Sequence, residues 1–321
     1  MTALRPSRHF WLLPCLLLLL VVPTSARSAT STDRSSASTS ISIAVLPIEP
    51  AALAFYAKDR GYFRRQGLEV TIKILADPLQ LSSAVVSGEV EFSGTSIGVL
   101  ALLKSRGLPV KLVAAAALNR AKAPTSALVA APGKRITRAR DLVGKLVAID
   151  GPNTPAHIGL LKWLKLRGVS ADKVRLTYIP FPLMPGPLRR GAVDAAVLPE
   201  PVLTVVTRRG AKRIAPIINA VCPQDCLLTG VMARRDIDPG LAARLRNALQ
   251  AAAVWANQKR NDRASGAILA KYTGVDKALI REITRTAFAP RLRLAPAQPW
   301  IDADAEFGVI PRSFPAAELV K

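Results

Sequence analysis

The sequence predicts an α/β protein with two similar lobes, each a mostly parallel sheet flanked by helices. Strand-like apolar runs alternate with helical patterns from residue 41 to about residue 235. A short motif occurs once in each half of that region, and the pattern becomes mainly helical beyond it. Such alternation is typical of parallel sheets covered by helices.

The first half of the alternating region supplies three strands and three helices. β-branched content and alternation predict strands at 41–46, 68–75 and 90–92. Helical spacing predicts helices at 51–66, 79–87 and 96–105. Gly88 can end the second of these helices in the left-handed conformation.

The second half repeats the scheme. Strands are predicted at 145–149, 174–179 and 193–198, and helices at 155–167, 183–190 and 201–209. Three further helices are predicted at 241–259, 263–272 and 277–286. The Pro-rich tail that follows is predicted to be irregular.

The recurring motif links the two halves. Residues 87–93 (SGEVEFS) and 190–196 (RGAVDAA) each join a helix end, a Gly, one spacer, a Val, an acid and a strand of small residues. Because each copy lies within its own strand-helix run, the repeat indicates two similar lobes.

The N-terminal stretch 1–28 has the features of a cleavable signal peptide. Arg5 and Arg8 precede the apolar block 10–22, and small residues follow the block. The block is shorter than the roughly 20 residues that a spanning helix needs. Residues 29–40 are nearly free of apolar side chains and are predicted to be a disordered tether. We therefore expect a soluble protein in the periplasm or outside the cell.

The formal net charge of +23 invites the interpretation of a nucleic-acid partner. However, the basic residues occur as scattered pairs, and no basic arm is interleaved with aromatic residues. The signal peptide also directs the chain away from nucleic acid. We interpret the charge as a basic solvated surface.

Cysteine usage agrees with export. Cys15 lies within the signal peptide, which leaves Cys222 and Cys226 as an even pair in an oxidising compartment. The pair can form a disulfide that closes a tight loop, or it can remain as two thiols. No metal site and no cofactor are predicted, since the mature chain has one histidine, His157.

The segment Gly94–Gly98 (GTSIG) fits G-x-S-x-G, the pattern of the nucleophile elbow of serine hydrolases. In those enzymes the catalytic histidine follows the serine and an acid, usually near the chain end. His157 is only 61 residues beyond Ser96 and lies in the next predicted helical repeat. Without a placed base the serine cannot be activated. We predict that Ser96 forms hydrogen bonds and is not a nucleophile.

Two strand-to-helix elbows of small residues favour ligand binding. Residues 93–96 (SGTS) form one, and residues 150–155 (DGPNTP) form the other. The first N–H groups of each following helix are unpaired, and the helix dipole favours anionic or electron-rich groups. Two facing elbows would form a cleft between the lobes. The alternative is that Thr95 and Thr154 only cap their helices.

Several stretches resemble extracytoplasmic solute-binding proteins of the nitrate, sulfonate and taurine type, a group that includes thiamine-pyrimidine-precursor binding proteins. The resemblance spans roughly residues 41–260 and is carried by four segments: 54–70 (AFYAKDRGYFRRQGLEV), 87–98, 141–148 (DLVGKLVA) and 188–201 (LRRGAVDAAVLPEP). It implies the two-lobed type II periplasmic-binding-protein fold. It also implies a small-molecule solute, delivery to a membrane permease of an ATP-binding-cassette importer, and a monomer.

The resemblance also implies an arrangement of domains. Lobe 1 would comprise residues 41–122 plus 228–321, and lobe 2 would comprise residues 123–227. The hinge crossings would lie near 119–125 and 219–229, so that the cysteine pair would lie at the second crossing, beside the cleft.

Ligand-binding positions carry over residue by residue. The expected set is Pro47, Ile48, Glu49, Gly94, Thr95, Ser96, Asn119, Asn153, Thr154, Phe181 and Glu200. Rival interpretations remain for some of them. Glu49 and Glu200 can be acids at helix termini, and Phe181 can be a core residue.

The sequence does not identify the ligand, and two alternative functions remain. No arginine lies in either elbow to hold a sulfonate, whereas Glu49, Asp150 and Glu200 would suit a nitrogen heterocycle. An exported enzyme, either a serine hydrolase or a relative of the thiamine-pyrimidine-forming proteins, is a second hypothesis. Those eukaryotic relatives have a cysteine-rich motif that this chain lacks. A sensor module for a membrane signalling protein is a third.

Overall fold

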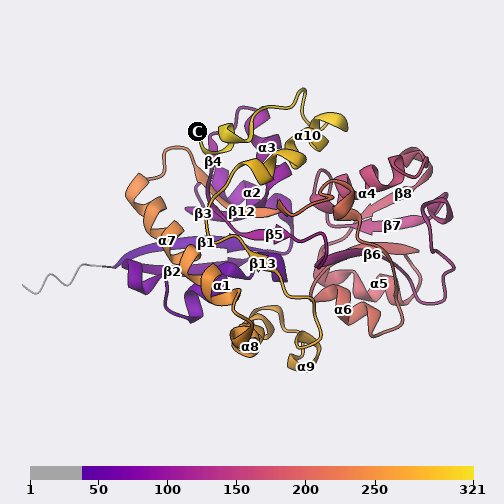
Figure 1. Ribbon diagram of the computed structural model, residues 1–321, viewed down its shortest axis with the longest axis horizontal. Coiled ribbons are helices and arrows are strands. Elements are labelled where there is room, and N and C mark those ends of the chain that lie inside the picture. Colours follow the sequence, from indigo (N-terminus) through magenta and orange to yellow (C-terminus); the bar gives the residue numbers. More distant parts are fainter. Residues whose placement is uncertain (1–37) are drawn as a thin grey trace, which may run out of the picture. The chain divides into compact units, whose positions relative to one another are not determined.

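The computed structural model describes residues 38–321. The predicted signal peptide lies outside the described residues, as does all but the end of the predicted tether. The described chain is built around two five-stranded sheets (Figure 1).

The first sheet has the strand order β2-β1-β3-β12-β4. Its strands are β1 (Thr39–Val45), β2 (Leu68–Ile74), β3 (Phe92–Ser96), β4 (Val110–Ala115) and β12 (Thr229–Arg234). β1 pairs in parallel with β2 and β3, whereas β12 is antiparallel to both β3 and β4. Four strands therefore run in one direction, and only β12 is reversed.

The second sheet has the strand order β10-β6-β9-β7-β8. Its strands are β6 (Ser126–Ala130), β7 (Leu146–Ile149), β8 (Arg175–Tyr178), β9 (Ala195–Pro199) and β10 (Lys212–Ala215). β7 is parallel to β8 and β9, whereas β6 is antiparallel to β9 and β10. In each sheet the reversed strand is the first one after the chain arrives from the other sheet.

A small third sheet includes two strands from the segments that connect the large sheets (Figure 1). It consists of β5 (Ala117–Asn119), β11 (Cys226–Leu227) and β13 (Ala287–Phe288), with β5 in the middle. All of its pairings are antiparallel. It therefore joins the two segments that connect the large sheets.

Helices cover both faces of the first sheet. They are α1 (Leu53–Asp59), α2 (Pro78–Val86), α3 (Ile97–Ser105), α7 (Pro239–Ala256), α8 (Asp262–Thr273), α9 (Lys277–Ile280) and α10 (Gln298–Glu306). Alternate residues of β1 point to opposite faces. Ile41 and Ile43 pack in one core cluster with α1 and α7, and Ala44 packs in another with α2, α3 and α10.

The second sheet is covered in the same way by α4 (Pro155–Lys165), α5 (Pro185–Arg189) and α6 (Val202–Thr207). Val147 and Ile149 pack with α4, while Ala148 between them packs with α5 and α6. These alternating burial patterns confirm the predicted two-lobed α/β architecture with mostly parallel sheets.

Several sequence expectations were wrong in detail. The helix expected at 51–66 breaks after α1, where Gly61 takes a φ of 70° and a short 3-10 helix follows at Arg64–Gln66. The strand expected at 90–92 runs instead from Phe92 to Ser96, and β1 begins two residues earlier than expected, within the predicted tether.

The tail was predicted to be irregular, and this too was wrong. It contains α10, whose Trp300 and Ile301 are buried in the same cluster as α2 and α3. The helices within residues 38–321 are each too short or too polar to span a bilayer.

Candidate functional site

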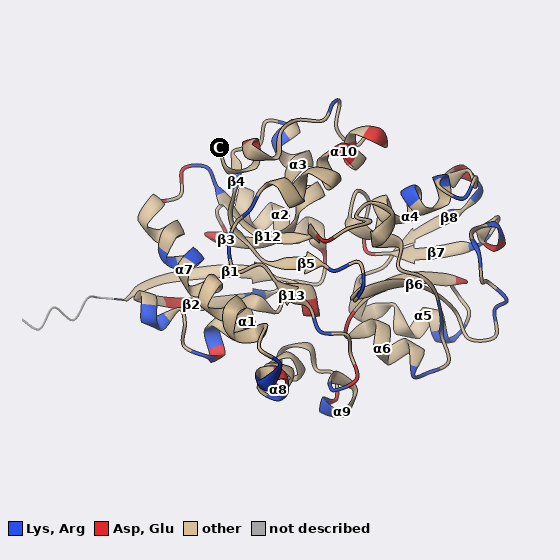
Figure 2. Ribbon diagram, viewed as in Figure 1, with Lys and Arg blue, Asp and Glu red and all other residues tan. Residues whose placement is uncertain are grey.

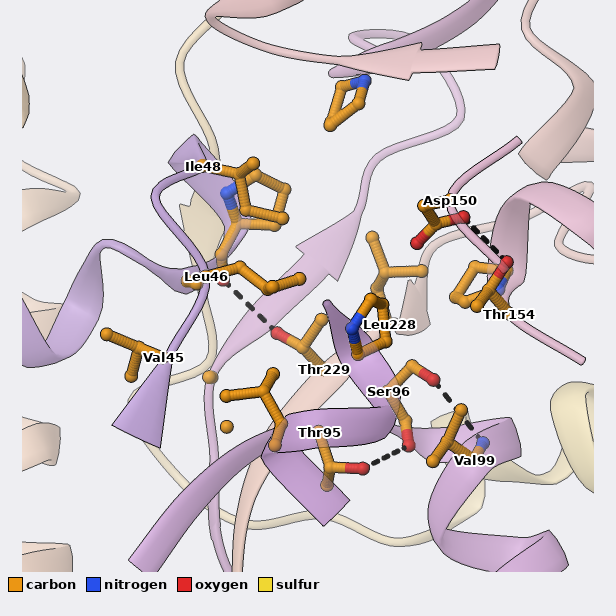
Figure 3. A pocket seen from close by; sticks show the side chains of 18 of the residues that line it. Val45, Leu46, Ile48, Thr95, Ser96, Val99, Asp150, Thr154, Leu228 and Thr229 are labelled. Atoms are coloured by element: carbon orange, nitrogen blue, oxygen red, sulfur yellow. Dashed lines mark hydrogen bonds between the residues drawn. The ribbon is translucent and has the colours of Figure 1, made fainter. Parts of the chain in front are cut away.

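A cavity of about 120 Å³ lies between the two large sheets and is lined by residues of both (Figure 3). On the side of the first sheet, Leu46 and Ile48 follow β1, and Thr95 and Ser96 end β3. On the side of the second sheet, the lining includes Asp150 and Thr154, between β7 and α4, and Phe181, beyond β8. Loops after the carboxyl ends of strands thus meet here, which is where α/β proteins commonly bind small molecules.

The lining is mainly aliphatic, with a few polar side chains. The polar members are Thr95, Ser96, Ser126, Asp150, Thr154 and Thr229, and no Lys, Arg or His is among the lining residues. Figure 2 shows the Lys and Arg residues of the described chain dispersed over helices and loops. The cavity is therefore apolar, with acidic and hydroxyl groups at a few points.

Most of the hydroxyl groups already have partners in the protein. Ser96 accepts a hydrogen bond from the Val99 amide at 3.3 Å and so caps α3. Thr95 donates to the Ser96 carbonyl at 3.1 Å, and Thr229 donates to the Pro50 carbonyl at 3.2 Å (Figure 3). These bonds hold the loops in shape, and they leave the Ser96 O–H as a donor and the Thr95 oxygen as an acceptor for a ligand.

The first elbow differs from the sharp turn expected at 93–96. β3 continues through Ser96, and α3 begins at the next residue. Gly94 and Thr95 are paired with Val231 and Gly230 of β12. An extended strand at this place keeps Ser96 in a capping role, which agrees with the prediction that it forms hydrogen bonds.

The second elbow places Asp150 and Thr154 together. The Thr154 hydroxyl donates to Asp150 Oδ1 at 2.7 Å and accepts from the His157 amide at 3.4 Å, which caps α4. Asp150 is 8% exposed. Burial raises the pKa of its carboxyl to about 7, and the Thr154 hydrogen bond only partly offsets this.

Six of the expected ligand-binding residues line the cavity. They are Ile48, Gly94, Thr95, Ser96, Thr154 and Phe181. Phe181 is 6% exposed and also belongs to the core cluster of α5 and α6. It is therefore both a core residue and a lining residue of the cavity.

The other five expected residues are outside the lining. Pro47 is half-buried beside it, and Glu49 is fully buried beneath it. Asn119 donates to Asn219 Oδ1 at 3.0 Å, between the two connecting segments. Asn153 has a left-handed φ of 59° and donates its amide to His157 Nδ1 at 3.0 Å.

Glu49 is held by a buried network. Its carboxylate accepts from Arg285 Nε at 2.8 Å, from Tyr56 Oη at 3.1 Å and from the Thr286 amide at 3.1 Å. Burial raises the pKa of Glu49, and Arg285 acts in the opposite direction. All of these partners are protein groups, so the carboxylate is directed away from the cavity.

Glu200 is also fully buried, next to the cis peptide bond that precedes Pro201. Its carboxylate accepts from the Thr204 amide at 3.0 Å and from Arg213 Nη2 at 3.1 Å. The interpretation as an acid at the start of a helix fits this geometry, because α6 begins at Val202.

Sequence reasoning missed part of the lining. Leu228, Thr229 and Gly230 reach the cavity because β12 returns to the middle of the first sheet. No local pattern marks them as site residues. Asp150 was noted within the elbow but was not included among the expected ligand-binding residues.

The cysteine pair forms a disulfide between Cys222 and Cys226. Both residues are buried in the core cluster of α2, α3 and α10 and are not part of the cavity lining. Among the described residues, no three His, Cys, Asp or Glu side chains gather as a metal site would require.

A family model described as NMT1/THI5 like matches residues 51–229. None of the curated proteins matches the chain. The similarity to this family agrees with the resemblance seen in the sequence.

Solved structures of the same fold include binding proteins and an enzyme. The alkanesulfonate-binding protein SsuA from Xanthomonas axonopodis pv. citri, bound to MOPS, is similar with a TM-score of 0.71 and 17% identity, covering 88% of this chain and 98% of that one. The periplasmic nitrate-binding protein NrtA from Synechocystis PCC 6803 gives a TM-score of 0.70 at 14% identity, over 88% of this chain and 85% of that one. The desulfurization enzyme DSZB gives a TM-score of 0.64 at 16% identity, covering 88% of this chain and 96% of that one. At these identities the likeness concerns the fold alone.

Proposed function

The chain belongs to the NMT1/THI5-like family, and from this premise we propose that it is an exported solute-binding protein. It captures a small organic molecule in the cavity between its lobes and delivers that molecule to a membrane permease of an ATP-binding-cassette importer. The proposal includes a monomer in the periplasm or outside the cell. It also includes the lobe boundaries expected from the sequence, with lobe 1 at 41–122 plus 228–321 and lobe 2 at 123–227.

One observation carries the proposal: the cavity is lined by residues of both sheets. A ligand there contacts both lobes only when they are closed. Because a ligand shifts an equilibrium only by its difference in affinity for the two states, such a ligand favours the closed form. SsuA and NrtA, which have the same fold, are named for sulfonate and nitrate binding.

An exported enzyme is the second candidate, since DSZB shows that this fold also carries catalysis. The contacts around Ser96 argue against a serine hydrolase. Its hydroxyl is used as a helix cap, and the Nδ1 atom of His157 is occupied by the Asn153 amide. A nucleophile needs a base within hydrogen-bond reach. No pair of this kind is formed by Ser96 among the described residues.

A sensor module would use the same cavity and the same closure, so the bound ligand does not distinguish it from a transport protein. The two differ in their partner. Crosslinking of the loaded protein in membranes identifies either a permease or a signalling receptor.

The proposal is tested by native mass spectrometry of the purified protein, which should show a small molecule that is released unchanged on unfolding. A ligand at about 100 times its dissociation constant should raise the free energy of unfolding by roughly 2.7 kcal/mol.

Ala51→Phe, a change at a lining residue, should remove the bound mass and the stabilisation. Ala123→Phe is the matched control at an exposed position outside the lining and should retain both. Conversion of the bound molecule into a product, or a ligand unaffected by Ala51→Phe, would contradict the proposal.

A further inference from the structure

Among residues 38–321, Asp150 is the only ionisable side chain that lines the cavity between the lobes. The remaining lining groups are aliphatic, aromatic or hydroxyl-bearing. The charge state of this single carboxyl therefore decides which ligand charge the cavity accepts.

Only one of the two carboxyl oxygens of Asp150 has a hydrogen-bond partner in the protein. Oδ1 accepts the Thr154 hydroxyl, while Oδ2 accepts no hydrogen bond from any other described residue. Figure 3 shows one oxygen directed at Thr154 and the other directed toward the cavity. Oδ2 is thus a hydrogen-bond acceptor available to a ligand, on a side chain that is more than nine-tenths buried.

Several N–H groups at the starts of α3 and α4 are already hydrogen-bonded within the protein. At the start of α3, the Ile97 amide donates to the Leu228 carbonyl at 3.1 Å and the Val99 amide donates to Ser96. At the second elbow, the Asn153 and His157 amides donate to the His157 ring and to Thr154. Helix N-termini bind anions through free N–H groups, so these bonds reduce the number of donors that an anion in the cavity would find.

The nearby titratable groups do not favour an anion either. Asp77, which caps α2 next to the lining residue Pro78, is the one charged group that contributes to the raised pKa of Asp150. His157 has a pKa lowered by burial, and its Nδ1 atom is an acceptor, so it is neutral near pH 7. An anion in the cavity would have no opposite charge within the lining, and burying an unpaired charge is costly.

We propose that Asp150 determines the specificity of the site, and that the ligand is a small, mainly apolar amine whose ammonium group donates to Asp150 Oδ2. This inference rests on the proposed function, because it assigns a ligand class to the same cavity. It excludes sulfonate and nitrate as ligands of this chain. Charge-assisted hydrogen bonds of this type are stronger than neutral ones.

The size of the cavity limits the apolar part of the ligand. An apolar protein cavity of about 150 Å³ can hold benzene. The cavity here measures about 120 Å³, which leaves room for a five-membered ring or a branched chain of similar size. Ile48 and Leu228 line it and provide apolar contact for such a group.

Proton linkage provides a distinct signature. Below its raised pKa, Asp150 carries a proton that must leave before it can pair with an ammonium group. Amine affinity should therefore increase from pH 6 to pH 8 and then level off. Near pH 6 it should be about tenfold weaker than at pH 8, since one pH unit below the pKa corresponds to a factor of ten.

The test uses full-length mature protein and three probes of one shape: cyclopentylamine, cyclopentanol and cyclopentanecarboxylate, with methanesulfonate and nitrate as further anions. Isothermal calorimetry gives the affinities, and repetition at pH 6 in two buffers of different ionisation enthalpy gives the protons released. The amine should bind with proton release, the alcohol should bind more weakly, and the anions should not bind.

Two variants separate the role of Asp150 from a general effect of buried acids. Asp150→Asn keeps the shape of the side chain. It should lower the affinity for the amine about 100-fold at pH 8 and leave the affinity for the alcohol unchanged. A loss of this size is in the range seen when one partner of a buried charged pair is removed. Asp304→Asn is the matched control, because Asp304 is a second buried acid whose pKa is about 7 and it is not a lining residue. It should leave both the amine affinity and its pH dependence unchanged.

Binding of an anion in preference to the amine, no binding of the amine at millimolar concentration, or a pH dependence that persists in Asp150→Asn would overturn the inference. The proposed function is judged separately by the molecule that copurifies and by its loss in Ala51→Phe. A copurifying sulfonate, for example, would leave the proposed function intact and refute the amine.

Discussion

Arg285 and Glu49 form an ion pair whose carboxylate is fully buried, with Nε 2.8 Å from Oε1. The two residues are far apart in the sequence, and they join the segment after β1 to the segment before β13. Tyr56, which also donates to Glu49, lies edge-on to Trp255 and Phe288 in the core of the first sheet. The pair therefore has a structural role at the base of the cavity.

Replacing Glu49 by Ala should destabilise the protein by about 3–5 kcal/mol, because it leaves the Arg285 charge unpaired in a mostly buried position. Urea unfolding followed by circular dichroism measures this. Glu89→Gln, at the exposed pair with Lys73, is the control and should cost no more than about 1 kcal/mol. Equal losses of unfolding free energy in the two variants would show that the buried pair stabilises the protein no more than the exposed pair.

A second set of ion pairs connects the two large sheets through their helices. Glu306 of α10 contacts Lys162 and Lys165 of α4, the latter at 2.9 Å. These lysines lower the pKa of Glu306, so the contribution of the pairs is present above the ordinary value of 4.5 and is lost as the pH falls through the lowered pKa.

Glu306→Gln should weaken ligand binding less than about fivefold, since partly exposed ion pairs contribute about 0–1 kcal/mol. The expected cause is a shift toward the open form, which small-angle scattering detects as a larger radius of gyration without ligand. The effect should fade in high salt. An affinity loss that is independent of salt would point to a packing change instead.

Asp304 of α10 is buried without a hydrogen-bond partner for either carboxylate oxygen among the described residues. Burial raises its pKa from 3.8 to about 7. The folded state therefore binds more protons than the unfolded state between these values, and stability falls as the pH rises from about 4 through 7.

Asp304→Asn removes this dependence and should make the protein more stable than the wild type at pH 8, by about 1–3 kcal/mol, with little gain near pH 4. Urea midpoints at both pH values measure the difference. A gain that is equal at both pH values would rule out ionisation as its cause.

Gly98 in the first turn of α3 lies directly against this carboxyl. A Cβ atom at this position would be 2.9 Å from Asp304 Oδ2. Gly98→Ala should therefore cost about 1–3 kcal/mol through overpacking. The double variant Gly98→Ala/Asp304→Ala should cost less than the sum of the two single variants, because the two side chains occupy the same space.

The disulfide between Cys222 and Cys226 closes a loop with a sequence separation of only 4. The chain-entropy model gives about 2 kcal/mol for so short a loop. Cys222→Ala/Cys226→Ala should lose about this amount of stability, and dithiothreitol should then have no further effect on it. A wild-type protein that reacts with iodoacetamide before reduction would show that the bond is absent.

Local patterns in the sequence predicted much of the fold. The alternation in 68–75 and the β-branched content of 41–46 identified β2 and β1, because one buried face leaves a period of two. Thr154, which the sequence offered as a helix cap, caps α4 in the structure, whereas α3 is capped by Ser96 and not by Thr95. The close cysteine pair and the second elbow were also visible without the fold.

Three strands of the large sheets that lie next to the connecting segments were not predicted. β4, β6 and β12 are short runs rich in Ala and Val, and they are buried on both faces. Such runs show no alternation, so periodicity cannot distinguish them from buried helix. For the same reason, no local pattern indicated that Leu228 and Thr229 line the cavity.

The sequence by itself determined the two-lobed α/β architecture, the family and the position of the second elbow, because these follow from periodicity, caps and short motifs within a few residues. Only the tertiary structure decided the direction of each polar side chain. Glu49 and Glu200 turn inward to Arg285 and Arg213, while Asp150 keeps one oxygen toward the cavity. The physical reason is that a buried carboxylate takes the partners that distant segments bring to it, and no local pattern contains those partners.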